Sequence, residues 1–216
     1  MSMRASPPAM RGAGPAERRF VVYVEGPRDR DVIDAWVRRA SPSLARLLAP
    51  AWVILGGRQP ARAALHLARA REALAGTRGL CVLDGDALAG PLASDAEGLE
   101  LFTWRRRHIE SYLLVPDAIA RASRSRDARL RRLLDDELPR AGDEDALASF
   151  DAKGFLGRKG PLARFLGRPV APGAIARAMR LDELHADVHA LLEALAAGVG
   201  AQRPEVAVYV RPRGGV

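Results

Sequence analysis

Residues 79–86 read Gly-Leu-Cys-Val-Leu-Asp-Gly-Asp, and this stretch decides the fold. Four apolar residues, 80–83, predict a short buried strand. The strand stops at Asp84, a glycine lets the chain turn, and Asp86 follows. Because side chains at i and i+2 of an extended segment face the same way, Asp84 and Asp86 should point at one spot beyond the strand. Two carboxylates this close repel each other unless a cation lies between them, and such oxygen ligands suit Mg²⁺ or Mn²⁺.

A second strand ends in the same way. Residues 19–24 are rich in β-branched and aromatic side chains, which predicts a strand, and Glu25 and a glycine follow it. A proline then opens a helix predicted over 27–39. Asp29 falls on the apolar stripe of this helix, which favours a ligand site shared with Glu25 over a simple contact with the helix dipole.

The order of elements predicts a parallel sheet. A strand over 51–55 and a helix over 60–75 lie between the two acid-terminated strands, so the chain reads β-α-β-α-β. Right-handed crossovers make such strands parallel, and ligands gather at their carboxyl ends. We therefore expect Glu25 and Asp84 to meet at one edge of the sheet. The glycine after each acid leaves room for a phosphate to approach.

One more strand follows before the chain turns helical. Residues 99–104 alternate in hydropathy and predict a fourth strand near the sheet edge. Apolar residues at i, i+3 and i+4 from Ile109 predict a short helix packed on the sheet, and Glu110 leads that helix directly after three arginines. By its local context alone, Glu110 is more typical of a solvated acid at a helix start.

The composition from Pro116 onward favours helices. Five are predicted, over 127–138, 143–150, 161–166, 172–179 and 182–197. Between them, residues 154–160 read as a glycine-rich basic loop that holds Lys159. Near the end of the chain, the apolar run 206–210 has the composition of a further strand.

The composition bounds the class of protein. The 216 residues include a single cysteine and no apolar run long enough to span a bilayer, so we expect a cytoplasmic protein without disulfides or a membrane partner. The net charge of +8 favours a polyanionic partner, most often nucleic acid. We expect a disordered basic tail over 1–17, an α/β domain over 18–120 and a helical extension over 121–216 packed on it.

Two acidic blocks carry a resemblance to a known family. Residues 24–29, Val-Glu-Gly-Pro-Arg-Asp, and 82–86, Val-Leu-Asp-Gly-Asp, resemble the signature blocks of the TOPRIM domain, a Rossmann-like fold with a mainly parallel sheet flanked by helices. That family includes topoisomerases, primases, the RNase M5 maturases and the OLD (overcoming lysogenization defect) nucleases. Residues 107–114 are similar to the segment after the second block in OLD-type members. Lys159, within 157–160, is similar to the lysine late in the OLD-type domain.

The resemblance implies a Mg²⁺- or Mn²⁺-dependent endonuclease with one or two ions. The catalytic residues would be Glu25, Asp84, Asp86 and Lys159. The metal ligands would be Glu25, Asp29, Asp84, Asp86 and Glu110. Lys159 would steady the scissile phosphate.

The sequence departs from the fused OLD proteins because it contains no Gly-x-x-x-x-Gly-Lys-Ser/Thr loop. It resembles stand-alone OLD-type proteins that work beside a separate ABC-type, SMC-like ATPase in anti-phage or DNA-processing systems. The substrate would be DNA, tRNA or another RNA, and a homodimer would let two sites cut two strands. Two alternatives stay open: an RNA-processing enzyme of the RNase M5 type, and a non-catalytic module that binds nucleic acid or a partner.

Overall fold

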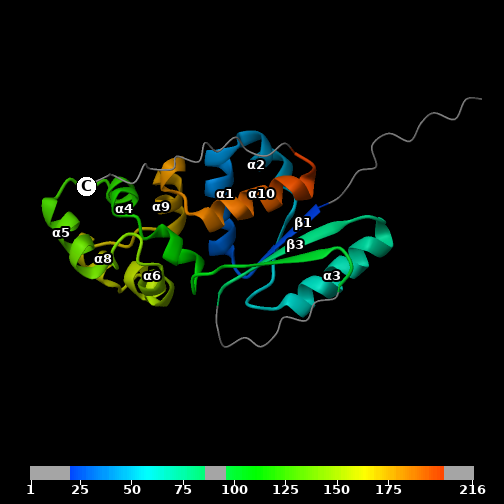
Figure 1. Ribbon diagram of the computed structural model, residues 1–216, viewed down its shortest axis with the longest axis horizontal. Coiled ribbons are helices and arrows are strands. Elements are labelled where there is room, and N and C mark those ends of the chain that lie inside the picture. Colours follow the sequence, from blue (N-terminus) through cyan, green and yellow to red (C-terminus); the bar gives the residue numbers. More distant parts are fainter. Residues whose placement is uncertain (1–19, 86–95, 202–216) are drawn as a thin grey trace, which may run out of the picture.

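The computed structural model describes residues 20–85 and 96–201, which form an α/β fold (Figure 1). Its sheet has four parallel strands in the order β2-β1-β3-β4. The strands are β1 (Phe20–Val24), β2 (Trp52–Ile54), β3 (Arg78–Leu83) and β4 (Leu99–Thr103). The predicted parallel sheet is therefore confirmed, as is the edge position of the fourth strand. The tail over 1–17, Asp86 and the strand expected over 206–210 lie outside the described residues.

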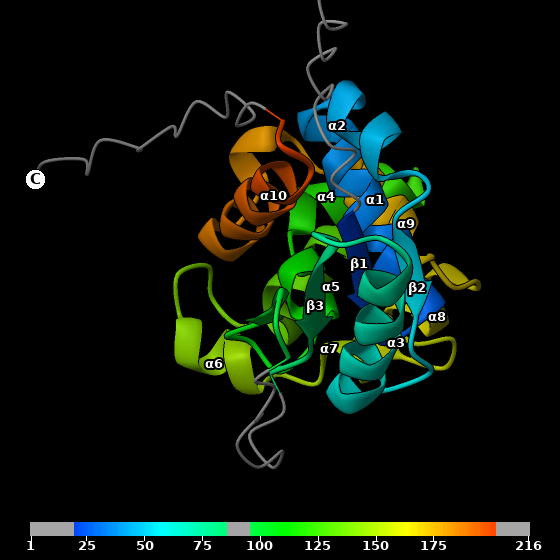
Figure 2. The same cartoon turned by 90° about the vertical axis from the view of Figure 1, so that its right-hand side faces the viewer.

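Helices cover both faces of the sheet. α1 (Pro27–Ala40), α2 (Pro42–Leu48) and α10 (Ala186–Val199) lie on one face, and α3 (Pro60–Ala73) lies on the other, as the two views agree (Figures 1 and 2). Right-handed β-α-β crossovers produce this layering when successive strands pair on opposite sides of the first. α1 begins at a proline, as predicted, and Asp29 caps its start by accepting the Gly26 N–H at 2.7 Å.

The core follows the alternation of the central strands. Val22, Val24, Leu80 and Val82 pack with α1, α2 and α10 in one large apolar cluster. The intervening side chains of the same strands pack with α3 in a smaller cluster, formed by Tyr23, Leu55, Ala63, Leu67, Cys81, Leu83 and Leu99. Since successive side chains of a strand point to opposite faces, near-continuous apolar runs are what a sheet covered on both faces requires.

The second half of the chain is helical, as predicted. Its elements are η1 (Ile109–Leu113), α4 (Pro116–Ser123), α5 (Ala128–Glu137), α6 (Glu144–Ser149), α7 (Ala152–Leu156), α8 (Pro161–Leu166), α9 (Pro172–Ala178), η2 (Leu181–Glu183) and α10. α9 packs against both α1 and α4. The Trp36 indole N–H of α1 points at the Met179 sulfur, 3.3 Å away, beyond the end of α9. The large core cluster therefore continues from the sheet into the helical part.

The prediction of a loop over 154–160 is wrong for its first three residues. Residues up to Leu156 belong to α7, whose first turn is capped by the Asp151 carboxylate, which accepts the Gly154 N–H at 2.9 Å. This cap lets the short helix begin despite its internal glycine. Within residues 20–85 and 96–201, no helix has the length and apolar character needed to cross a membrane.

The glycine after Asp84 leaves space for a neighbouring backbone segment and not for an approaching phosphate. A Cβ at Gly85 would lie 2.4 Å from the Trp104 carbonyl oxygen and 2.5 Å from that of Arg106, because the chain leaving β4 crosses directly over this position. At Gly26 the nearest atom to such a Cβ is an Asp29 carboxylate oxygen at 3.5 Å, an ordinary contact. The room expected for a phosphate is therefore present only at the first of the two glycines.

Gly85→Ala is expected to lower the free energy of unfolding by at least about 2 kcal/mol, because rigid backbone atoms must move. Gly26→Ala, the matched control, should cost less than about 1 kcal/mol, since its backbone is extended and the added methyl meets no rigid neighbour. Urea unfolding followed by the fluorescence of the buried Trp36 and Trp104 measures both. Equal losses for the two variants would contradict this account of Gly85.

Candidate active site

Two acids from distant parts of the chain meet at the carboxyl ends of the central strands. Glu25 directly follows β1 and Asp84 directly follows β3, and these strands are neighbours in the sheet. A Glu25 carboxylate oxygen accepts the backbone N–H of Asp84 at 2.8 Å. The meeting expected from the strand order is therefore present, and it is made through a direct hydrogen bond.

Asp84 is buried, with 8% of its surface exposed, and its carboxylate is held by groups from outside the sheet. One oxygen accepts from the Lys153 ammonium at 2.8 Å and lies 3.1 Å from His108 Nδ1. The other accepts the Ile109 N–H at 3.2 Å. The Arg58 guanidinium donates to the Asp84 carbonyl oxygen. A buried carboxylate needs such partners, because its desolvation would otherwise cost several kcal/mol.

Glu110 also belongs to this site. It lies in the first turn of η1 and is only 1% exposed, so the expectation of a solvated helix-start acid is wrong. One carboxylate oxygen pairs with Arg28 at 3.2 Å, and the other has no hydrogen-bond partner in the part of the chain that the structure describes. A buried oxygen without a donor costs about 1–3 kcal/mol or more, and a cation or a donor from a ligand at Glu110 would offset that cost.

The pKa of Asp29 is raised by burial and by the neighbouring acids. Burial raises its pKa most, the negative charge of Asp84 adds to this, and Glu110 and Glu25 contribute further, so the pKa reaches about 6 although the Gly26 N–H opposes the shift. Burial likewise raises the pKa of Glu25, and the charge of Asp84 contributes. These four acids therefore share one negative field at the edge of the sheet. The fifth acid expected there, Asp86, lies outside the described residues.

The structure brings Lys153, and not Lys159, to the acids. Lys153 sits on α7 with its ammonium on Asp84, whereas Lys159 is exposed and its backbone carbonyl accepts from Arg164 at 2.6 Å. Lys153 and His108 are the contacts of Asp84 that sequence reasoning did not assign. One signal pointed to Lys153: the chain uses arginine almost everywhere and keeps lysine at only these two positions.

A polar network fixes the segment that carries Glu110. The Tyr112 hydroxyl donates to Asp187 at 2.6 Å and accepts the Arg106 N–H at 3.0 Å. Asp187 lies in the first turn of α10 and also accepts from Arg105 at 2.6 Å. Buried Arg106 makes a two-pronged ion pair with Glu144. The network holds η1 between the sheet and α10, which positions the Ile109 N–H and Glu110 against Asp84.

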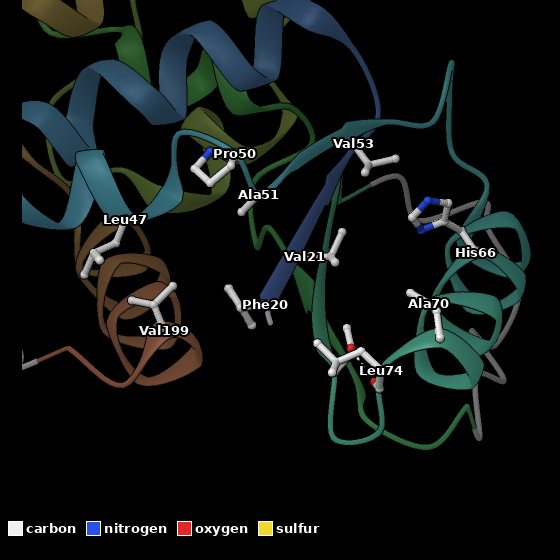
Figure 3. A pocket seen from close by; sticks show the side chains of 12 residues that line it. Phe20, Val21, Leu47, Pro50, Ala51, Val53, His66, Ala70, Leu74 and Val199 are labelled. Carbon is white, nitrogen blue, oxygen red and sulfur yellow. Dashed lines mark hydrogen bonds between the residues drawn. The ribbon is translucent and has the colours of Figure 1, made fainter. Parts of the chain in front are cut away.

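A groove of about 480 Å³ opens beside the acids. Glu110 and Lys153 line its end, Arg28 and Arg158 add positive charge, and residues 169–173 form much of its apolar wall. A larger cavity of about 650 Å³ lies toward the amino ends of β1 and β3, and its lining is almost entirely apolar (Figure 3). Since no carboxylate lines the larger cavity, the smaller groove is the one connected to the acids.

Comparison with known proteins identifies the fold. No protein-family model matches the chain, and no curated protein is significantly similar to it. The C-terminal region of the Burkholderia pseudomallei OLD protein superposes with a TM-score of 0.50 at 16% identity, over 84% of this chain and 98% of that one. This chain has the fold of an OLD C-terminal region. The OLD-type resemblance drawn from the acidic blocks is thereby confirmed at the level of the fold.

Two structures of the C-terminal region of the Xanthomonas campestris pv. campestris OLD protein also match. One has 16% identity and a TM-score of 0.48 over 85% of this chain and 96% of its own. The other has 14% identity and a TM-score of 0.47 over 85% of this chain and 94% of its own.

The donor chemistry of these acids fits a hard divalent cation. Carboxylates converge, and one buried Glu110 oxygen lacks a donor in the described chain. Within residues 20–85 and 96–201, however, no group of three His, Cys, Asp or Glu side chains is gathered closely enough to hold an ion as arranged. Lys153, His108 and the Ile109 N–H already engage both oxygens of Asp84. Glu25, Asp84 and Glu110 would be the ligands, with Asp29 beside them.

Asp29→Asn is expected to stabilise the metal-free protein at about pH 7.5 by roughly 1 kcal/mol. The folded state raises the pKa of Asp29 to about 6, so the wild type loses stability as pH rises from about 4 to that value, whereas the neutral amide does not. Urea unfolding at about pH 7.5 and pH 5 measures the gain, which should shrink at the lower pH. Glu72→Gln, a control at an exposed acid on α3 that makes no ion pair within the described residues, should show no gain. A loss of stability in Asp29→Asn at both pH values would contradict this reading of the acid cluster.

Proposed function

We propose that this chain is a metal-dependent nuclease that hydrolyses phosphodiester bonds of nucleic acid. The observation that carries the proposal is the meeting of Glu25 and Asp84 at the carboxyl ends of adjacent strands. Buried Glu110 of η1 lies near them, and one of its oxygens has no partner in the described chain. Parallel α/β sheets bind their ligands at this edge. The OLD-type fold supports the proposal, because the same acidic blocks carried the resemblance to OLD nucleases.

One or two Mg²⁺ or Mn²⁺ ions would polarise the phosphodiester and stabilise charge on the leaving oxygen. The residues of the chain would bind and orient the ion. Glu25, Asp84 and Glu110 would hold the ion, and Asp29 and Asp86 are expected to complete the set. The Arg28–Glu110 pair and the hydrogen bond between Glu25 and the Asp84 N–H orient two of these carboxylates before any ligand arrives.

The groove supports nucleic acid as the substrate. Arg28, Lys153 and Arg158 line it and lead to the acids, so a phosphodiester lying there would meet positive charge along its path. Arg158 is exposed and makes no ion pair within the described residues. The net charge of +8 attracts a polyanion at long range. Lys159 directly follows Arg158 in the chain and stays a predicted contact to the phosphate.

The sequence resemblance extends the proposal to biology. We place the nuclease in an anti-phage or DNA-processing system of the cytoplasm, under the control of a separate ABC-type ATPase. A non-catalytic module is less well supported, because it would bear the cost of the clustered acids without using them.

Cleavage of supercoiled plasmid and of total tRNA with Mg²⁺ or Mn²⁺ tests the function. Wild type is expected to cut one of them, and EDTA should abolish the cut. Asp84→Ala and Glu25→Ala are expected to lower the rate at least about a hundredfold, because each removes a proposed metal ligand. Glu72→Gln, a control at an exposed acid on α3 away from the groove, should keep full activity.

The choice of substrate separates the nuclease from its alternative, since cleavage of tRNA alone would favour an RNA-processing enzyme of the RNase M5 type. Folded, metal-bound protein that cuts neither substrate, with or without the ATPase partner, would overturn the nuclease.

Arg158→Ala is expected to weaken binding of a short oligonucleotide about 3- to 10-fold at low salt and to reduce the salt dependence by about one phosphate contact. Fluorescence anisotropy in EDTA measures binding without cleavage. Arg69→Ala is the matched control, because Arg69 is equally exposed and makes no ion pair within the described chain but lies on α3, away from the groove. Equal loss in both variants would show that binding depends on overall charge and not on the groove.

A further inference from the structure

The cation nearest to the acids is part of the chain itself. The Lys153 ammonium lies 2.8 Å from an Asp84 carboxylate oxygen. Burial lowers the pKa of Lys153, but the hydrogen bond to Asp84 and the charges of Asp84, Glu110 and Asp29 outweigh this, and the net pKa is raised. Lys153 is therefore positively charged at neutral pH, and its charge offsets part of the negative field of the site.

α7 is fixed by packing, so the Lys153 side chain can move without the helix. Ala152, Phe155 and Leu156 of α7 are buried, and the helix packs against η1 and α8. Lys153 is not one of these buried residues, and 41% of its side chain is exposed. A lysine reaches through a flexible four-carbon stem, so its ammonium can leave Asp84 without any change in α7.

The ammonium and a divalent ion would compete for the same oxygen. Mg²⁺ binds carboxylate oxygens at about 2.0–2.1 Å, so an ion on this Asp84 oxygen would sit next to an ammonium held at hydrogen-bond distance. Two such cations repel each other strongly where water is scarce. Glu110 gives independent evidence that something else belongs here, since its buried second oxygen has no donor among the described residues even with Lys153 in place.

We propose that Lys153 occupies the cation position of the metal-free site and that the divalent ion binds in exchange for it. This inference rests on the proposed nuclease function. The released ammonium has a destination, because Lys153 also lines the groove in which a phosphodiester would lie. A strand in the groove therefore draws Lys153 off Asp84 and opens the metal site, so that metal and nucleic acid bind cooperatively.

The chain offers a matched pair for the test, since it contains two lysines and, among the acids that the structure describes, only Lys153 contacts one. Mn²⁺ affinity is measured by the electron paramagnetic resonance of free Mn²⁺, without substrate. Lys153→Met is expected to bind Mn²⁺ at least about fivefold more tightly than wild type, because the competing charge is gone. Lys159→Met should stay within about twofold of wild type. Thermal unfolding verifies that both variants are folded.

A second readout observes the exchange directly. The side-chain ammonium groups of two lysines give two resolvable nuclear magnetic resonance signals, which the two Met variants assign. Addition of Mg²⁺ is expected to shift the Lys153 signal and to leave the Lys159 signal in place. A phosphorothioate oligonucleotide should raise the Mn²⁺ affinity of wild type more than that of Lys153→Met.

The failures of the inference and of the function are distinguishable. The exchange would be overturned, and the nuclease left standing, by the following result. Wild type binds Mn²⁺, Asp84→Ala does not bind it, and Lys153→Met binds it no more tightly than wild type. Mn²⁺ that binds neither wild type nor Lys153→Met would overturn the metal site, and the proposed function with it.

Discussion

The burial of the Asp84 charge is the constraint on which the rest of the structure depends. The carboxylate lies at the end of a central strand with 8% of its surface exposed, and the sheet itself supplies it with no side-chain cation. Its partners come from the segment after β4, which provides His108 and the Ile109 N–H, and from α7, which provides Lys153. The helical half of the chain thus completes the site, which explains why one apolar cluster runs through both halves.

Polar pairs, each with at least one buried member, fix the segment that supplies these contacts. Asp187, at the start of α10, joins Tyr112 and Arg105, and Arg106 joins Glu144. Each pair links the segment around η1 to a helix distant in sequence. Removing the partner of a buried charge lowers the stability of the folded state by several kcal/mol. These pairs therefore favour one arrangement of η1. The position of Glu110 therefore depends on residues up to 77 positions further along the chain (187 minus 110).

Sequence reasoning succeeded where short-range patterns and chain handedness suffice. The strands, the helix from Pro27 and the shared location of Glu25 and Asp84 follow from apolar runs, from a proline at a helix start and from right-handed crossovers. Local context was misleading at Glu110, where three adjacent arginines suggested solvent and the structure shows a buried acid. Only the family resemblance had placed Glu110 in the site. It also assigned Lys159 to the site, whereas the lysine that contacts Asp84 is Lys153, because a short capped helix and a glycine-rich loop look alike in a segment this small.

The sequence by itself determined the parallel α/β sheet and the edge at which its acids gather, because hydropathy period and strand order are local or topological properties. Only the tertiary structure decided which lysine reaches Asp84, that Glu110 is buried with a free oxygen in the described chain, and that Gly85 makes way for the backbone of Trp104 and Arg106. Those outcomes depend on close approaches between segments far apart in sequence. Desolvation and steric exclusion act over a few ångströms in space and leave no periodic trace along the chain.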